Sequence, residues 1–128
     1  MNLLLDTQVA LWAITASPRL STKAQDLILD PTATIWISVA SLWEIVIKHA
    51  IGRGDMPVSG GDAMRYFEES GYRRLPVDAR HVLAVADLPA HHDDPFDRIL
   101  IAQAKTYPMR LLTQDPHILQ YGENMVGV

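Results

Sequence analysis

The chain has no cysteine among its 128 residues. Without cysteine there are no disulfide bonds and no thiolate zinc sites, which fits a protein of a reducing compartment. No apolar run reaches the roughly 18 residues that a membrane-spanning helix requires. The apolar stretch near the N-terminus ends at Asp6 and lacks the basic region that begins a signal peptide. We therefore expect a cytoplasmic protein that does not associate with membranes.

The sequence also lacks an excess of positive charge, because its formal net charge at pH 7 is −4. This charge disfavours a protein that coats nucleic acid with a broad basic surface, but it is compatible with a local acidic site that attracts divalent cations. The net charge therefore does not exclude an RNA substrate. Hydrophobic residues make up 48% of the chain and charged residues 20%, and this composition and length predict one globular domain over residues 1–128.

Short apolar runs alternate with amphipathic stretches through the first half of the chain, which predicts alternating strands and helices. The expected elements are a strand at residues 2–6, helices at 7–14 and 21–29, a strand at 34–37 and a helix at 39–51. Ser38 is a suitable N-cap for the last of these helices, and Gly52 is a suitable C-cap. The glycine-rich stretch at 52–61 predicts a loop, either a plain connector or a mobile lip over a site.

The second half of the chain continues the alternation. The expected elements are a helix at 62–69, a strand at 72–75, a helix at 78–87, a polar loop at 91–93, a helix from 94 to about 107, a strand at 110–113, a short helix at 116–121 and a further strand at 125–128. Asp94 and Pro95 support the start of the long helix, because Asp is a good cap and Pro suits the first helical position. The predicted fold class is α/β, with a central parallel sheet of four or five strands and helices on both faces.

Four carboxylates that are far apart in the sequence fall close to the expected junctions between strands and helices: Asp6, Glu44, Asp97 and Asp115. Asp6 closes the apolar run at residues 3–5, and Asp115 follows the strand expected at 110–113. Both are therefore expected at the C-terminal ends of strands, which is the edge at which open parallel sheets bind ligands. The pattern predicts one acidic pocket built from remote parts of the chain.

Carboxylates gathered in a small volume repel one another by about 4 kcal/mol per pair at a separation of about 4 Å and an effective dielectric constant near 20. Such a cluster needs protons or a cation. Mg²⁺ or Mn²⁺ is the natural choice, because hard cations prefer carboxylate and water oxygens. One or two such ions lower the pKa of a bound water, orient it toward a phosphodiester and neutralise charge on the leaving oxygen. The predicted chemistry is metal-assisted nucleic-acid cleavage.

Each acid also has a purely structural interpretation. Helix capping, or a favourable place in a first helical turn, equally accounts for the acids at helix starts, which are Asp6, Asp94, Asp97 and Asp115. Glu44 interrupts an otherwise apolar helix face, and its structural alternative is an ion pair with Lys48 one turn later. Capping and metal binding are compatible, because a cap at a strand-to-helix turn lies at the edge of the sheet where a ligand would sit. The joint pattern of the acids, rather than any one of them, supports the metal site.

Four segments in register carry a more specific signal. They are Leu4-Leu5-Asp6-Thr7, the stretch from Ser38 through Ser41-Leu42-Trp43-Glu44 to Lys48, the block His92-Asp93-Asp94-Pro95-Phe96-Asp97-Arg98 leading to Ala102-Gln103-Ala104, and Leu111-Leu112-Thr113-Gln114-Asp115. Together they resemble PIN-domain ribonucleases of the VapC toxin type, in the family's order and along the full chain.

This resemblance implies an acidic tetrad that holds Mg²⁺ or Mn²⁺ for RNA cleavage. The matching residues are Asp6, Glu44, Asp97 and Asp115, with Asp6 and Asp97 as the first choices for direct ligands. The resemblance further implies the toxin half of a toxin–antitoxin pair, a small antitoxin whose tail covers the acidic cleft, and a homodimer.

Residues beside the tetrad could also bind the metal or support the tetrad carboxylates. Asp94 lies on the same side of the first helical turn as Asp97 and either binds metal or only caps the helix. Thr7 and Thr113 can support a carboxylate or a water, or serve only as local caps. His91 and His92 suit a transition metal, but the surrounding acids favour a harder ion, and we expect both histidines to be solvated loop residues.

An RNA substrate also requires positive charge near the acidic cleft to bind its phosphates. The candidates are Lys48, Arg53, Arg73, Arg74 and Arg98. Arg98 is the first choice because it adjoins Asp97, and its alternative is an exposed charge or a salt bridge. The three tryptophans, Trp12, Trp36 and Trp43, can stack on bases, but their apolar surroundings predict core packing.

Other classes of protein match the sequence less well. A phosphorylation-dependent receiver needs an acidic pair after the first strand and a lysine near the end of the fifth, whereas Asp6 stands alone and no lysine follows Lys105. A phosphatase with Asp-x-Asp after the first strand is disfavoured because Gln8 occupies the second acidic position. A PIN scaffold without nuclease activity is the remaining alternative, and the complete tetrad argues against it.

Overall fold

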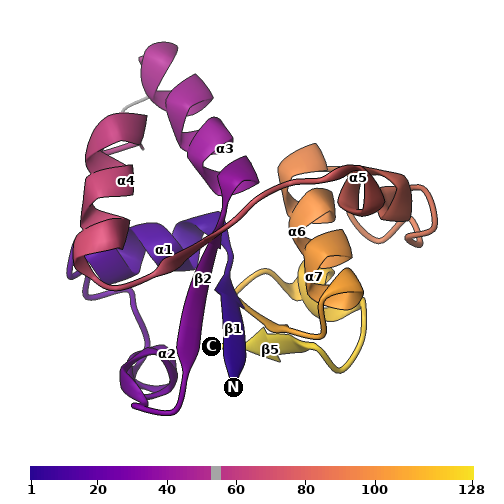
Figure 1. Cartoon of the computed structure of the whole chain (residues 1–128), viewed down its shortest axis with the longest axis horizontal. Coiled ribbons are helices and arrows are strands. Elements are labelled where there is room, and N and C mark those ends of the chain that lie inside the picture. The colour runs from indigo at the N-terminus through magenta and orange to yellow at the C-terminus, as the bar shows by residue number, and fades with distance from the viewer. Residues whose placement is uncertain (53–55) are drawn as a thin grey trace.

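The computed structural model describes residues 1–52 and 56–128. Arg53, one of the residues expected to bind RNA, lies outside the described residues. The described chain forms a five-stranded sheet in the order β3-β2-β1-β4-β5, and every neighbouring pair of strands is parallel (Figure 1). The strands are β1 (Asn2–Leu5), β2 (Thr34–Ser38), β3 (Arg73–Leu75), β4 (Arg110–Thr113) and β5 (Met125–Gly127).

Seven helices connect these strands within the described residues. They are α1 (Thr7–Ile14), α2 (Thr22–Leu29), α3 (Val39–Ala50), α4 (Gly60–Glu69), α5 (Ala79–Val85), α6 (Pro95–Thr106) and α7 (Pro116–Leu119). The predicted α/β class and the parallel sheet are confirmed, and the sheet has five strands. Its order differs from the 2-1-3-4-5 arrangement of flavodoxin-like signalling receivers, which further disfavours that alternative.

The central strand β1 explains why helices cover both faces of the sheet. Its side chains alternate, so Leu3 and Leu5 enter one core cluster, which they share with α1, α3 and α4, while Leu4 enters the other, which it shares with α6 and α7. All three leucines are fully buried, and each such burial contributes about 1.5–3 kcal/mol. A strand buried on both faces needs the continuous apolar run found at residues 3–5. Figure 1 shows α1 and α4 on one side of the sheet and α5 to α7 on the other.

Helix caps fix where the chain turns between strand and helix. Ser38 caps α3 as expected, since its hydroxyl accepts a hydrogen bond from the Ala40 N–H at 3.0 Å. Gly52 follows the C-terminal end of α3 with a φ of +71°, in the left-handed region that glycine adopts at low cost. The helix α4 begins at Gly60, two residues before the expected start, because the Ser59 hydroxyl accepts from the Asp62 N–H at 3.1 Å.

The prediction that all three tryptophans pack in the core is wrong for Trp43. Trp12 and Trp36 are partly buried, but Trp43 is 62% exposed. Its ring lies edge-on to Phe96, with the two ring centroids 5.2 Å apart. The helix α3 is apolar around most of its circumference, and the side that carries Ile45 faces the core instead. Among the described residues, no helix has both the length and the hydrophobicity to cross a membrane.

Candidate metal centre

Asp6 lies at the C-terminal end of the central strand. β1 and β4 pair in parallel, with Leu5 beside Leu112, so the residues that follow the two strands adjoin. Asp6 caps α1, because its Oδ1 accepts from the Val9 N–H at 2.7 Å, and its Oδ2 accepts from the Thr113 hydroxyl at 2.5 Å. Thr113 therefore connects the ends of the two strands, and Asp6 combines the capping role with a place in the pocket.

Glu44 lies in the second turn of α3 and is only 5% exposed. Its Oε2 accepts from the Lys48 ammonium group at 2.6 Å, which is the ion pair one turn apart expected as the structural alternative. Its Oε1, however, is buried and has no hydrogen-bond partner among the described residues. An unsatisfied buried carboxylate oxygen is costly, and a cation in the pocket would satisfy it. The ion pair alone does not account for this side chain.

The first turn of α6 brings two acids to the same pocket. Asp94 caps the helix, since its Oδ1 accepts from the Phe96 N–H at 2.8 Å and from the Asp97 N–H at 3.3 Å. The capping role weighed for Asp94 is therefore present in the structure. Pro95 occupies the first turn, as Pro does at many helix starts. Asp97, in the same first turn, presents its carboxylate to the remaining acids.

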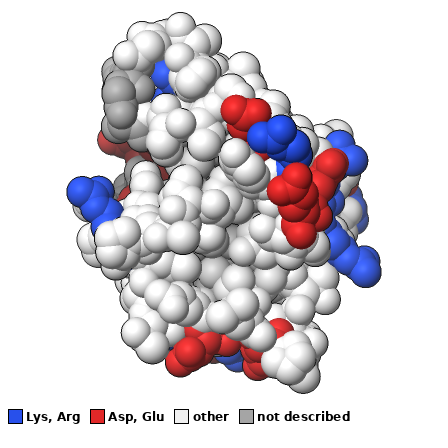
Figure 2. All heavy atoms as spheres, turned by 90° about the vertical axis from the view of Figure 1, so that its left-hand side faces the viewer, with Lys and Arg blue, Asp and Glu red and all other residues white. Residues whose placement is uncertain are grey.

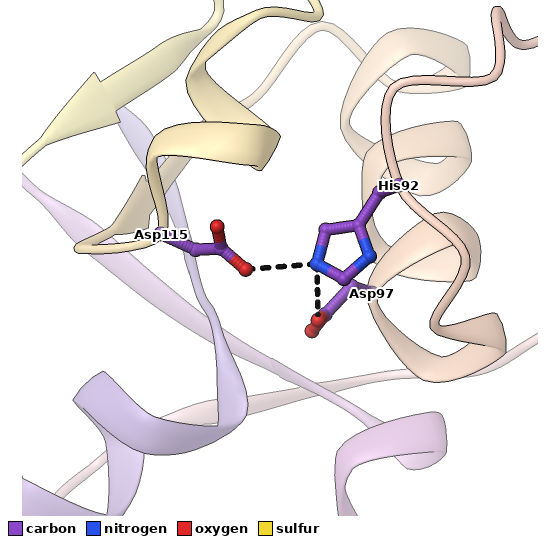
Figure 3. A group of neighbouring side chains, drawn as sticks. All are labelled: His92, Asp97 and Asp115. Atoms are coloured by element: carbon purple, nitrogen blue, oxygen red, sulfur yellow. Dashed lines mark hydrogen bonds and ion pairs between the residues drawn. The ribbon is translucent and has the colours of Figure 1, made fainter.

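Asp115 caps α7 by accepting from the His117 N–H at 2.8 Å. Its second oxygen, Oδ2, lies 2.8 Å from Nε2 of His92, and the same Nε2 lies 3.0 Å from Oδ2 of Asp97. Figure 3 shows the His92 ring reaching from its loop to a point between the two carboxylates. The expectation that His92 is a solvated loop residue is wrong, because its side chain is 15% exposed and enters the acidic site.

These side chains line one pocket of about 350 Å³. Its walls include the whole expected tetrad, Asp6, Glu44, Asp97 and Asp115. Thr7, Lys48 and Asp94 also line it. Four segments that are remote in the sequence thus meet at the C-terminal edge of the sheet, where the parallel topology predicts a ligand site.

The pocket disfavours negative charge on two of its acids. Burial raises the pKa of Asp6 to about 6. Hydrogen bonds from Thr113 and Val9 act to lower this pKa, whereas the nearby Glu44 charge acts to raise it. Burial, followed by the charges of Asp94 and Glu44, raises the pKa of Asp97 to about 7. For Asp115, partial burial opposes ionisation, but hydrogen bonds from the His117 amide and His92 outweigh it and lower the pKa. Burial and neighbouring negative charges therefore make ionisation of Asp6 and Asp97 unfavourable in this pocket.

The residues present fit a hard divalent cation. The pocket offers carboxylate oxygens, which Mg²⁺ and Mn²⁺ prefer. The buried Oε1 of Glu44 has no partner among the described residues, and the raised pKa values of Asp6 and Asp97 indicate carboxylates that a cation would stabilise. One carboxylate oxygen of Asp97 and one of Asp115 also lie within 4.8 Å of each other, beside the His92 ring.

The two threonines differ in their contacts. Thr113 supports a carboxylate, since its hydroxyl donates to Asp6, and it also accepts from the Asp115 N–H at 3.0 Å. Thr7 donates instead to the Ser41 hydroxyl at 2.9 Å and thereby joins α1 to α3. Thr113 therefore has the closer connection to the acidic site.

The guanidinium of Arg98, the first choice for RNA binding, donates to acceptors within the protein. Its Nη1 donates to the carbonyl oxygens of Pro89 and His92 at 3.1 and 3.2 Å, and to the Tyr121 hydroxyl at 3.2 Å. Its Nη2 donates to the carbonyl oxygen of Val85 at 3.1 Å. Because protein acceptors occupy the guanidinium, Arg98 holds the loop between α5 and α6 in place. That loop carries His92.

The fold and the pocket define a class: an α/β protein with a cluster of acids at the carboxyl edge of a parallel sheet. The chain belongs to the PIN domain family, whose model matches residues 3–124. No curated protein sequence matches the chain.

Solved structures share the fold at low sequence identity. One is the crystal structure of VapBC2 from Rickettsia felis, bound to a DNA fragment from the promoter of these proteins. Its TM-score is 0.70, with 15% identity over 100% of this chain and 98% of the matched chain. Another is VapBC-1 from nontypeable Haemophilus influenzae, with a TM-score of 0.64 and 17% identity over 94% and 92% of the two chains. FitAcB from Neisseria gonorrhoeae has a TM-score of 0.60 and 18% identity over 93% and 91%.

Proposed function

We propose that this protein is an Mg²⁺- or Mn²⁺-dependent endoribonuclease and the toxin of a toxin–antitoxin pair. The observation that carries the proposal is the meeting of Asp6, Glu44, Asp97 and Asp115 in one pocket, with a buried Glu44 oxygen that has no partner among the described residues. The membership in the PIN domain family supports nuclease chemistry. The sequence motifs that resemble VapC-type ribonucleases favour RNA as the substrate.

Asp6 and Asp97 are the residues proposed to hold the metal directly, with Glu44 and Asp115 completing the acidic set. When bound, the metal supplies an acidified water and neutralises charge that develops on a phosphodiester. Thr113 orients the Asp6 carboxylate through its hydroxyl. Lys48 lies beside Glu44 at the wall of the pocket and brings positive charge near the position of an RNA phosphate.

The proposed protein partner is a small antitoxin, and a homodimer is also proposed. The solved structures with the same fold include VapBC proteins, which supports an antitoxin partner. An apolar hollow of about 480 Å³ between α3, α5 and α6 offers a surface for protein contact. Trp43 and Val82 line it and are 62% and 56% exposed.

The charge distribution is consistent with an RNA site confined to a cleft. Among the described residues on the face seen in Figure 2, small clusters of acidic and basic side chains are separated by uncharged surface. We therefore expect Lys48, which lines the pocket, to supply positive charge for phosphate binding there.

The test is RNA cleavage by the purified protein with Mn²⁺, with and without EDTA, beside the variants Asp6→Asn and Asp97→Asn. Asp93→Asn is the matched control, because it removes one charge from an exposed acid in the loop that leads to α6. We expect the wild type and Asp93→Asn to cleave only with metal, and both tetrad variants to lose at least about 100-fold in rate, since a direct metal ligand is removed. Full activity in both tetrad variants, or activity in EDTA, would contradict the proposal. A wild type without any cleavage would favour a PIN scaffold that has no nuclease activity.

A further inference from the structure

His92 occupies a place in the acidic site that the tetrad does not explain. It lies in the loop before α6, three residues ahead of the first helical residue, Pro95. Its Nε2 is 2.8 Å from Asp115 Oδ2 and 3.0 Å from Asp97 Oδ2, so one ring nitrogen contacts two acids from different elements (Figure 3). The question is whether this nitrogen is itself a ligand for the metal or a donor to the acids.

The other ring nitrogen decides between these roles. Nδ1 of His92 lies 3.0 Å from the backbone N–H of Asp94, which can only donate. Nδ1 must therefore present its lone pair to that N–H, and the proton of the neutral ring is on Nε2. A protonated Nε2 has no lone pair to offer a metal, but it can donate to the carboxylates beside it. Metal-binding histidines show the opposite arrangement, in which the nitrogen away from the metal is the donor.

The surroundings of His92 fix its ring in this arrangement. The His92 carbonyl oxygen accepts from Arg98 Nη1 at 3.2 Å. The preceding residue, His91, donates its backbone N–H to the Tyr121 hydroxyl at 3.0 Å. The His117 ring lies edge-on to the His92 ring, with centroids 5.7 Å apart. The loop is therefore held at its backbone, and the ring is held at both nitrogens.

We propose that His92 is a positioning residue of the acidic site, whose Nε2–H holds the carboxylates of Asp97 and Asp115 in register for a metal without coordinating it. This inference rests on the proposed metal-dependent function. Two carboxylates that share a donor repel each other less and lose orientational freedom before the metal arrives. Partners that orient metal ligands typically contribute 10- to 100-fold to metal affinity.

The first experiment measures Mn²⁺ affinity from the electron paramagnetic resonance signal of the free ion. His92→Gln keeps an N–H donor at a similar reach, while His92→Phe keeps a ring and removes the donor. His91→Phe is the control, because its ring lies against Tyr121, with centroids 5.1 Å apart, and not against the acids. We expect His92→Phe to bind Mn²⁺ about 10- to 100-fold more weakly, and His92→Gln and His91→Phe to bind nearly as tightly as the wild type. Equal Mn²⁺ affinity in the wild type and His92→Phe would overturn the inference.

The second experiment uses the wild type alone and does not depend on how a variant folds. Long-range nitrogen–proton correlation spectra of the metal-free protein report which ring nitrogen carries the proton, and we expect Nε2. Pulsed electron paramagnetic resonance of the Mn²⁺ form reports directly coordinated nitrogen, and we expect none. A proton on Nδ1, or a coordinated ring nitrogen that His92→Phe removes, would make His92 a ligand and overturn the positioning role. A wild type that binds no Mn²⁺ would overturn the proposed metal site together with this role, whereas failure of this inference alone leaves tight Mn²⁺ binding intact.

Discussion

Asp97→Asn is expected to stabilise the metal-free protein at neutral and alkaline pH. Burial, followed by the charges of Asp94 and Glu44, raises the pKa of Asp97 from 3.8 to about 7. At about 1.4 kcal/mol per pKa unit, this difference corresponds to roughly 4 kcal/mol. The Asp97 side chain is 20% exposed, and neighbouring acids share the repulsion, so we expect a gain of about 2 kcal/mol.

The sign of the pH dependence follows from the direction of the pKa. A carboxyl whose pKa is raised by folding supports the folded state below about pH 4, and this support is lost as the pH rises through 7. Asn does not titrate. The advantage of Asp97→Asn over the wild type should therefore be largest near pH 8 and disappear near pH 4.

Urea unfolding in EDTA across this pH range measures the effect, with Asp93→Asn as the control for loss of one charge from an exposed site. Addition of Mn²⁺ should then reverse the order, because a ligand bound only by the folded wild type adds about 2.7 kcal/mol at 100 times its dissociation constant. Equal stabilities of Asp97→Asn and the wild type near pH 8 would contradict a raised Asp97 pKa, as would an advantage of Asp97→Asn that grows toward acid pH.

Three further predictions test the supports of the site. Thr113→Val removes the hydroxyl that donates to Asp6. We expect a further rise in the pKa of Asp6 in a carboxyl NMR titration, and a loss of about 1–2 kcal/mol of stability in urea unfolding. An unchanged titration of Asp6 would contradict this prediction. Arg98→Lys replaces a planar group that donates in several directions, and we expect a loss of about 2–3 kcal/mol of stability. Unchanged stability with weaker RNA binding would instead indicate that Arg98 binds phosphate. Gly60→Ala would make its Cβ overlap with Val46 Cγ2, and we expect a loss of about 1–3 kcal/mol that Val46→Ala largely relieves. A Cβ at Gly61 would meet no described atom within 4 Å, so Gly61→Ala should be neutral in thermal unfolding.

The fold was predictable from the sequence because its strongest signals are local. The run at residues 3–5 is apolar at every position, which marks a strand buried on both faces. Asp94 and Pro95 mark the start of α6, where the structure has it. Helix ends were less accurate: α5 ends at Val85 and α7 at Leu119, each two residues before its expected end. A helix end depends on packing that a local pattern does not contain.

The convergence of the four tetrad acids was also predictable, because parallel topology carries strand ends to one edge. The roles of His92 and Arg98 were not. A histidine in a polar loop has the same local sequence signal whether it is solvated or enclosed. His92 is enclosed because the folded chain places Asp115, 23 residues later, beside its ring. Arg98 adjoins Asp97 in sequence, but its guanidinium turns toward loop carbonyls that the sequence does not mark as neighbours.

Trp43 shows the same limit in a different form. Its apolar neighbours in the sequence predict burial, yet they surround a helix with only one side against the core. The exposed ring and the apolar hollow beside it belong to the surface proposed above for protein contact. A sequence pattern cannot distinguish the core of a protein from the core of an interface.

Anomalous diffraction of manganese, in crystals of the wild-type protein grown with Mn²⁺, shows whether the acidic pocket binds the metal. We expect a manganese peak in the pocket within coordination distance of Asp6 and Asp97 carboxylate oxygens, and no peak there in crystals of Asp97→Asn. Crystals grown at millimolar Mn²⁺ with no peak in this pocket, or with manganese bound only elsewhere, would contradict the proposed metal site.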